Sequence, residues 1–329
     1  MILAIETSCD DTCAAVVEDD GRRALSNVVH TQTEHARYGG VVPEVASRAH
    51  LERIDGVVEK ALADAGATLE ELTAVAVTVR PGLIGALLVG LASAKSVAYA
   101  RRLPLIPVNH LEGHVAAAYL EDPALEPPFV ALVASGGHTA LYSVGSDRSM
   151  SLLGETLDDA AGEALDKGAR MLGLGFPGGP ALSRAAEGGD PERYEFPVAL
   201  KGKDDLDFSF SGLKTSLLYT LQRLGEERVE EELPHLAASY EAAVVEALSR
   251  KLLRAAEMTD SRSLVVAGGV AANARLRGRL RTECEKRGIG IVIPAPALCT
   301  DNAAMIGAAA PHSRKIPFPG YLGLNARSI

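Results

Sequence analysis

The sequence predicts an α/β protein that is built from two related lobes. Short apolar segments of strand length alternate along the chain with longer segments of helical pattern. One local pattern, an apolar strand, a small polar turn and a second apolar strand, occurs at residues 2–17 and again at residues 129–144. We interpret this recurrence as an internal repeat of two α/β lobes. The 329 residues, 47% of them hydrophobic, are sufficient for two substantial cores.

The elements of the first half follow from their hydrophobic patterns. In chain order we expect strands at 2–6 and 14–17, a helix at 46–65, a strand at 75–79, a helix at 83–100 and a strand at 105–108. Arg80-Pro81-Gly82 ends the third strand. The fourth strand delivers His110 at its carboxyl end, which is where ligands collect in open α/β sheets.

The second half repeats the alternation. We expect strands at 129–134, 140–144, 264–267 and 289–293, and helices at 158–173, 212–225, 235–258, from 273 to about 286, and 301–310. Segments rich in glycine and small polar residues follow the strands, as they do in the first half.

Composition excludes several classes of protein. No apolar run of 18 or more residues predicts a membrane span, and the N-terminus lacks the pattern of a signal peptide. The four cysteines form no C-x-x-C pair, so we expect a reduced, cytoplasmic protein. Tryptophan is absent and aromatic residues make up only 4%, which argues against a stacking platform for nucleic acid.

His110 and His114 are the strongest chemical signal in the chain. On a helix, side chains four residues apart lie on one face, so both imidazoles can reach one divalent metal. The alternative is a pair of partly exposed histidines at a helix end. A metalloprotease is excluded because the residue after the first histidine is Leu111, and Glu112 lies roughly 200° around the helix from His110. A third ligand, Asp or His, must come from elsewhere.

Three loops have the small residues that suit ligand contacts. Residues 7–12 offer hydroxyls and two carboxylates, the Ser135-Gly136-Gly137 turn leaves backbone amides accessible, and Gly268-Gly269 precedes a helix. Each of them alone is explained equally well as a simple turn. Together, in a repeated arrangement, they favour a nucleotide held between two lobes.

Asp301 has two interpretations. Aspartate is a good N-cap, and this residue opens the last helix. It is also the best-placed late carboxylate for a third metal ligand. A His-His-Asp set with open positions fits iron(II) or zinc.

The segments that carry these features resemble the bacterial tRNA N6-adenosine threonylcarbamoyltransferase family, which was formerly labelled O-sialoglycoprotein endopeptidase. The resemblance runs from residue 2 to about 326, in order. The matching segments are IETSCD at 5–10, GGVVPE at 39–44, PGL at 81–83, NHLEGH at 109–114, SGGHT at 135–139, GEALDK at 162–167, PGGP at 177–180, FSFSGLK at 208–214, GGVAAN at 268–273 and CTDN at 299–302.

The resemblance implies a two-lobed, actin-like and sugar-kinase-like fold with duplicated ribonuclease-H-like lobes. The N-terminal lobe would comprise 1–108 plus 300–329 and the C-terminal lobe 109–299, with ligand and metal in the interlobe cleft. The implied reaction moves the threonylcarbamoyl group from threonylcarbamoyl-AMP to the exocyclic amine of the adenosine 3′ of the anticodon. The tRNAs concerned read codons that begin with A, and AMP is released.

The resemblance also implies roles for single residues. His110, His114 and Asp301 would hold one divalent metal per subunit, Fe²⁺ or Zn²⁺, and Asp10 would serve as acid or base. The substrate-binding residues would be Val133, Ala134, Ser135, Gly136, Gly137, Asp166, Gly179 and Asn273. The implied partners are a paralogous inactive-site subunit and a small P-loop ATPase, and no membrane is involved.

Two positions depart from the family pattern. Arg80 stands where glycine usually precedes Pro-Gly-Leu, which changes the loop beside the site entrance. Asp11 stands where glutamate is common, which leaves the acid–base assignment open.

Two other functions remain to be weighed. A small-molecule kinase or ATPase of the same superfamily would use Mg²⁺, for which imidazole is a poor ligand. A non-catalytic partner subunit would have a degenerate site, whereas these motifs are intact. The net charge of −10 is unusual for an RNA-binding enzyme. The basic segment 275–287 is either an RNA contact or a solvated helix face, so we expect tRNA binding to depend on partners.

Overall fold

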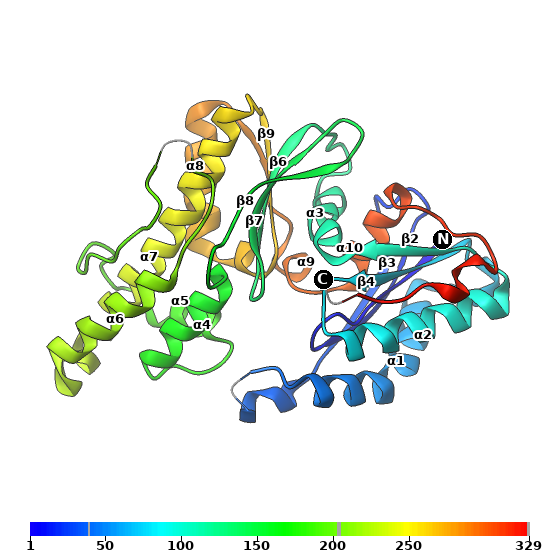
Figure 1. Ribbon diagram of the computed structural model, residues 1–329, viewed down its shortest axis with the longest axis horizontal. Helices are drawn as coiled ribbons and strands as arrows, with labels where there is room; N and C mark the ends of the chain where they lie inside the picture. Colours follow the sequence, from blue (N-terminus) through cyan, green and yellow to red (C-terminus); the bar gives the residue numbers. More distant parts are fainter. Residues whose placement is uncertain (39, 203–204, 328–329) are drawn as a thin grey trace. The chain divides into compact units, whose positions relative to one another are not determined.

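The structure is a computed structural model, and it describes residues 1–38, 40–202 and 205–327. It divides into two compact units, Met1–Leu125 with Thr300–Ile329, and Glu126–Cys299. Figure 1 shows the elements of both units. Gly39, the first residue of the segment 39–44, lies outside the described residues.

The first unit is built on a five-stranded sheet in the order β3-β2-β1-β4-β5. Its strands are β1 (Ile2–Glu6), β2 (Asp11–Val17), β3 (Ala24–Thr31), β4 (Ala74–Arg80) and β5 (Leu105–Asn109). β1 pairs antiparallel with β2 and parallel with β4, and β4 pairs parallel with β5. The central strand β1 is buried along its whole length, as expected for a strand covered on both faces.

Helices cover both faces of this sheet. On one face, α1 (Pro43–Ala65) and α2 (Ile84–Arg101) pack against each other and join a core that contains Leu3 and Ile5 of β1. Ala4 alternates with those two residues and contacts the position of Gly307 on α10 (Ala303–Ala309), which therefore covers the opposite face. α10 also packs closely against α3 (His110–Glu121).

The boundary of the first unit differs from the predicted one. The sequence led us to place 109–125 in the second lobe, whereas these residues group with the first unit. The physical reason is the packing of α3 on α10, which ties the helix after β5 to the end of the chain.

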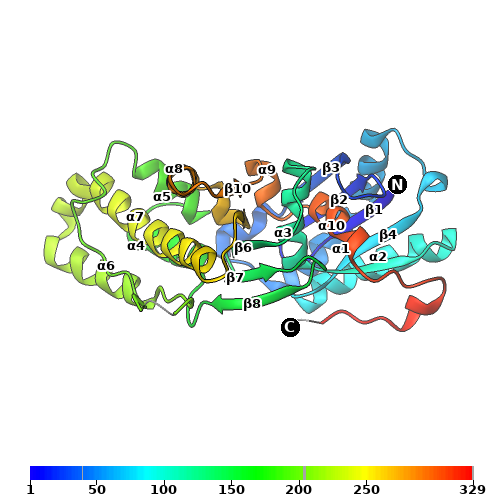
Figure 2. The ribbon, with the colours of Figure 1, turned by 90° about the horizontal axis from the view of Figure 1, so that it is seen from above.

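The second unit repeats the topology of the first. Its sheet has the order β10-β9-β6-β7-β8, with strands β6 (Phe129–Ala134), β7 (Thr139–Val144), β8 (Met150–Glu155), β9 (Ser263–Ala267) and β10 (Gly290–Val292). Figure 2 labels four of these strands, β10, β6, β7 and β8. β6 pairs antiparallel with β7 and parallel with β9, as β1 does with β2 and β4. The predicted internal repeat, and with it the mixed α/β class, is confirmed.

The remaining helices surround the second sheet. They are α4 (Ala161–Met171), α5 (Gly178–Ala185), α6 (Ser211–Leu224), α7 (Glu226–Met258), α8 (Ala274–Arg287) and α9 (Pro296–Cys299). Short 3₁₀ helices are η1 (Thr33–Tyr38), η2 (Leu69–Glu71), η3 (Gly269–Ala272), η4 (Ala310–His312) and η5 (Gly320–Gly323). Among the described residues, no helix is long and apolar enough to cross a membrane.

Some elements were not predicted from the sequence. β3 is half exposed and rich in polar residues, so it lacks an apolar run. α5 begins with Gly178-Gly179-Pro180, residues of low helix propensity, and no helix was predicted there. α7 starts at Glu226 rather than near 235, because the helix continues through Pro234.

Two glycine substitutions test the packing of α10. A Cβ at Gly307 would fall 2.8 Å from the Cβ of Val17, whereas a Cβ at Gly56 of α1 meets nothing within 4 Å. We expect Gly307→Ala to lower the free energy of unfolding by about 1–3 kcal/mol through overpacking. Gly56→Ala should instead raise it by about 0.5–1 kcal/mol through helix propensity. Thermal denaturation of both variants measures this difference. A Gly307→Ala protein as stable as the Gly56→Ala protein would contradict this packing.

Candidate metal centre

The two histidines lie at the start of α3, immediately after β5. The side chain of Asn109 caps the helix by accepting a hydrogen bond from the Leu111 amide at 2.9 Å. This cap starts the helix at His110 and places His114 one turn further along. The two rings lie 4.6 Å apart between centroids, and both are buried.

Asp301 does not cap the last helix, which was one of its two predicted roles. Its side chain is therefore available to the histidines. The N-cap of α10 is Asn302, whose side chain accepts from the Met305 amide at 3.0 Å. The Asp301 carboxylate instead faces the imidazoles. Its Oδ1 lies 3.5 Å from Nε2 of His110 and 3.2 Å from Nε2 of His114. The structure thus brings together all three predicted metal ligands.

Close helix packing makes this approach possible. Gly113 lies between the two histidines in the sequence, and a Cβ there would fall 2.7 Å from the Cδ1 of Ile306 on α10. The absence of a side chain at Gly113 therefore lets α3 lie against α10, the helix that follows Asp301.

The donor set fits a divalent transition metal. One ligand atom from each of the three residues lies within 4.8 Å of the others. Ligand atoms held about 2.0–2.2 Å from one ion lie roughly 2.8–3.6 Å apart, which covers both measured separations from Asp301. Neither ring nitrogen of His114 has a hydrogen-bond partner, although the side chain is 1% exposed. Buried polar atoms are normally satisfied, so this ring is consistent with a ligand role.

Glu6 holds His110 in place. Its carboxylate ends the buried strand β1 and lies 3.0 Å from Nδ1 of His110, and the Ser8 hydroxyl lies 3.1 Å from the same atom. Glu6 also accepts hydrogen bonds from the Ser8 amide and the Thr78 hydroxyl. A carboxylate on Nδ1 leaves Nε2 directed at the metal position and raises its basicity as a ligand.

The electrostatics of the centre favour a cation. Burial opposes the charged form of His110, but the carboxylates of Asp301 and Glu6 outweigh it and raise the pKa of His110 to about 9. Burial likewise acts to raise the pKa of Glu6, yet attraction to His110 leaves that pKa lowered. The buried Glu6 and the partly exposed Asp301 thus place two carboxylates beside one imidazole, a concentration of negative charge that a divalent cation would neutralise.

The predicted glycine loop of the second unit follows β6. Val133 and Ala134 are fully buried within the strand, so only their backbones can meet a ligand. The loop is fixed by a 2.8 Å bond from the Ser135 amide to the His138 carbonyl. Gly136 and Gly137 are exposed, and a Cβ at either would meet nothing within 4 Å. The loop therefore presents accessible backbone.

The other three predicted binding residues converge on α5. Asp166 accepts hydrogen bonds from the amides of Gly178 and Gly179 at 2.8 and 3.2 Å, and so caps this helix. Burial raises the pKa of Asp166. The amide group of Asn273 donates to Ser183 of α5 at 3.2 Å and to Glu241 at 2.7 Å. The loop and α4 also touch, because the Gly162 amide donates to the Ser135 carbonyl at 3.1 Å.

Two charged residues of these sites were not singled out from the sequence. Glu6 was noted only as part of a motif, and Glu241 was not noted. Both are buried carboxylates: Glu6 ends the apolar strand β1, and Glu241 lies on the buried face of α7. A carboxylate inside an apolar stripe requires a partner, and that requirement is the signal that would have identified them. Glu241 is paired with Arg275 at 3.0 Å.

Known proteins resemble this chain in sequence. The model of the family described as tRNA N6-adenosine threonylcarbamoyltransferase matches residues 23–308. The protein of that name from Syntrophus aciditrophicus is 52% identical over 307 residues, covering 93% of this chain and 90% of the relative. The one from Anaeromyxobacter dehalogenans strain 2CP-C is 54% identical over 314 residues, covering 95% and 93%.

Solved structures resemble it in fold. Component A of the (R)-2-hydroxyglutaryl-CoA dehydratase of Acidaminococcus fermentans has a TM-score of 0.56 at 16% identity, over 95% of this chain and 96% of its own. HypF of T. kodakarensis has a TM-score of 0.61 at 15% identity, over 94% of this chain and 46% of its own. These likenesses confirm the predicted actin-like and sugar-kinase-like fold. From the family match and the two relatives, the chain belongs to the tRNA N6-adenosine threonylcarbamoyltransferase family.

Proposed function

We propose that this chain transfers the threonylcarbamoyl group from threonylcarbamoyl-AMP to the exocyclic amine of the adenosine 3′ of the anticodon, releasing AMP. The acceptors are tRNAs that read codons beginning with A. The observation that carries the proposal is the cluster of the buried His110 and His114 with Asp301 in a chain of this family. In the reaction the amine nitrogen bonds to the carbamoyl carbon, the bond from that carbon to the phosphate oxygen breaks, and the amine loses a proton.

His110, His114 and Asp301 would hold one Fe²⁺ or Zn²⁺ ion. A bound ion would supply Lewis acidity and open positions for oxygen ligands of the threonyl end. Glu6 keeps the His110 ring in the orientation that a ligand needs. With three protein ligands supplied, positions remain for a substrate.

The residues of the second unit would hold the nucleotide end of the donor. The exposed backbone of Gly136 and Gly137 suits the phosphate or the developing oxyanion, while the Ser135 amide holds the loop through its bond to the His138 carbonyl. Val133 and Ala134 set the direction of that loop from within β6. Asp166, Gly179 and Asn273 would contact the ribose or adenine. AMP is a good leaving group, so positioning of donor and amine supplies most of the acceleration.

Two adjacent carboxylates are available to receive the proton. Asp10, the residue predicted from the sequence, lies partly exposed in the turn between β1 and β2. Asp11 begins β2, and burial, with a smaller contribution from the Asp301 and Asp10 carboxylates, raises its pKa to about 7 against a hydrogen bond from Thr31. We assign the proton transfer to Asp10 and treat Asp11 as the neighbour that carries an elevated pKa.

Two observations disfavour the kinase or ATPase alternative. The relatives that cover nearly the whole chain are named as threonylcarbamoyltransferases. The cluster also offers two imidazoles, which suit iron or zinc better than magnesium.

The proposed partners are a paralogous inactive-site subunit and a small P-loop ATPase. Ile84 and Leu88, one turn apart on α2, are 47% and 49% exposed and offer an apolar surface for such a subunit. None of the four cysteines, all in described residues, forms a disulfide, which supports a cytoplasmic location.

Removal of a metal ligand tests the proposal. We expect His114→Ala to purify without the single bound ion and to lose labelled-threonine transfer to unmodified tRNA by about 100-fold or more. His30→Ala is the matched control, because His30 lies on β3 of the same unit and outside the cluster. Metal analysis and the transfer assay, with the partner proteins present, give the two readouts. Full transfer by a metal-free His114→Ala protein would refute the assignment.

Replacement of Asp10 tests the proton acceptor. Loss of a positioned base lowers kcat by about 10²–10⁴-fold, so we expect a fall of this size for Asp10→Asn with the metal content unchanged. Asp20→Asn, at an exposed turn after β2, serves as the control. An Asp10→Asn protein with the kcat of the control would remove Asp10 from the mechanism.

The raised pKa of Asp11 predicts a pH-dependent stability of the metal-free protein. Its folded pKa of about 7 lies above its ordinary value of 3.8, so the folded state binds more protons between these values and loses stability as pH rises through them. Asp11→Asn should therefore raise the free energy of unfolding by about 1–3 kcal/mol at pH 8 and by much less at pH 4. Urea denaturation in chelator measures this, and an equal effect at both pH values would show that Asp11 is not perturbed.

A further inference from the structure

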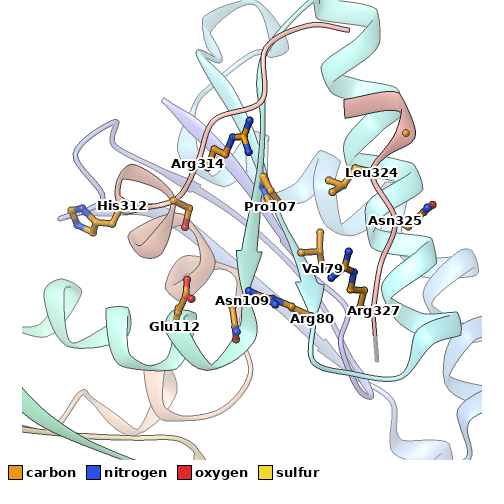
Figure 3. A pocket seen from close by; sticks show the side chains of 12 residues that line it. Val79, Arg80, Pro107, Asn109, Glu112, His312, Arg314, Leu324, Asn325 and Arg327 are labelled. Atoms are coloured by element: carbon orange, nitrogen blue, oxygen red, sulfur yellow. The ribbon is translucent and has the colours of Figure 1, made fainter. Parts of the chain in front are cut away.

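The first unit contains a cavity of about 580 Å³ whose lining includes none of the three metal ligands. It is lined by the ends of β4 and β5, the first turn of α3 and the segment 312–327 (Figure 3). Val79 and Arg80 come from β4, and Pro107 and Asn109 from β5. The segment 312–327 is held there by a 2.9 Å bond from the Arg327 amide to the Val79 carbonyl. This volume accommodates a nucleotide-sized group.

Three arginines dominate the charge of this cavity. Arg80 ends β4, and Arg314 and Arg327 come from the C-terminal segment, as Figure 3 shows. In the part of the chain that the structure describes, none of the three side chains forms an ion pair or hydrogen bond. Among the described lining residues Glu112 is the one carboxylate; burial raises its pKa, and Arg80 acts to lower it. A chain with a net charge of −10 thus concentrates positive charge here.

The cavity and the metal centre lie on different sides of α3. Glu112 lines the cavity, and it lies roughly 200° around the helix from His110, which faces Asp301. The amino-terminal end of α3, with the positive end of the helix dipole, borders the cavity at Asn109. This end of the helix adds to the attraction of the cavity for an anion.

We propose that this arginine cavity binds phosphates of the tRNA backbone. The inference rests on the proposed function for the identity of the RNA. Guanidinium groups pair with phosphate oxygens in a fork geometry, and within the described residues these three side chains form no ion pair that would compete. Among the described residues that line the cavity there is no tyrosine, phenylalanine or tryptophan, so its chemistry suits the backbone better than stacked bases. Arg80 strengthens the site where the family usually has glycine.

Single substitutions test this site. Arg80→Gln, Arg314→Gln and Arg327→Gln should each raise the KM for tRNA by about 3- to 10-fold. Each should also reduce the salt dependence of tRNA binding, as the slope of log Kd against log salt, by roughly one. The KM for threonylcarbamoyl-AMP and the metal content should not change. Arg53→Gln is the matched control, since Arg53 is an exposed arginine on α1 without an ion pair in the described residues.

The measurements use the full chain with its partner proteins, a fluorescent unmodified tRNA and a salt series. Variants whose tRNA affinity and salt slope equal those of Arg53→Gln would overturn the inference. A rise in the KM for the donor instead of the tRNA would also overturn it and indicate a site for a small phosphate compound. If the unsubstituted protein binds tRNA but transfers nothing, the proposed function fails. The binding measurements on the three arginine variants still decide whether the cavity binds tRNA phosphates. Absence of tRNA binding by the unsubstituted protein at every salt concentration would refute both.

Discussion

The packing of α10 against α3 is the constraint on which the metal centre depends. Asp301 is 187 residues beyond His114, and only this contact brings its carboxylate within 3.2 Å of the ring. The contact is made by residues with little or no side chain. Gly113 admits Ile306, and Gly307 lets α10 lie on β1 and β2. Because interiors are close-packed, a single methyl group at such a position must move a helix, and the helix carries a ligand with it.

A second consequence of this packing is a group of buried charges that must be compensated. Glu6, His110 and Asp301 share one small volume, and removing one partner of a buried pair costs about 3–5 kcal/mol. The proton on His110 compensates the carboxylates in the metal-free protein, and a divalent ion would take its place. Binding of the ion and release of that proton are therefore linked, which makes metal affinity fall as the pH is lowered. The Glu6 carboxylate serves both states because its bond is to Nδ1 and not to the nitrogen directed at the ion.

Much of the fold and of the metal centre could be predicted from the sequence. Where prediction failed, there is a physical reason for the failure. The repeat, the buried strands and the histidine pair follow from local patterns, since periodicity and the i, i+4 spacing act within one element. β3 and α5 were not predicted because their stability comes from tertiary contacts and not from an apolar pattern of their own. These contacts are sheet pairing for β3 and the Asp166 cap for α5. The choice between cap and ligand for Asp301 depended on whether Asn302 would take the cap, and two adjacent residues of similar propensity do not decide that. Glu6 became a functional residue only when β1 was placed beside α3.

The duplicated topology explains how the same arrangement of strands supports two kinds of site, one with charged side chains and one with exposed backbone. In both units the first two strands form a hairpin, and in both the loop between them carries small or polar residues. In the first unit that loop includes Ser8 and leads to Asp10, which makes it part of a charged centre. In the second unit the loop is Ser135-Gly136-Gly137, with accessible backbone and no charge. The shared topology determines where a ligand can contact the chain. The residues that follow the first strand of each unit determine whether this site offers charged side chains or backbone amides. The same rule accounts for the arginine cavity. It lies at the carboxyl ends of β4 and β5, where parallel strands present their following residues together.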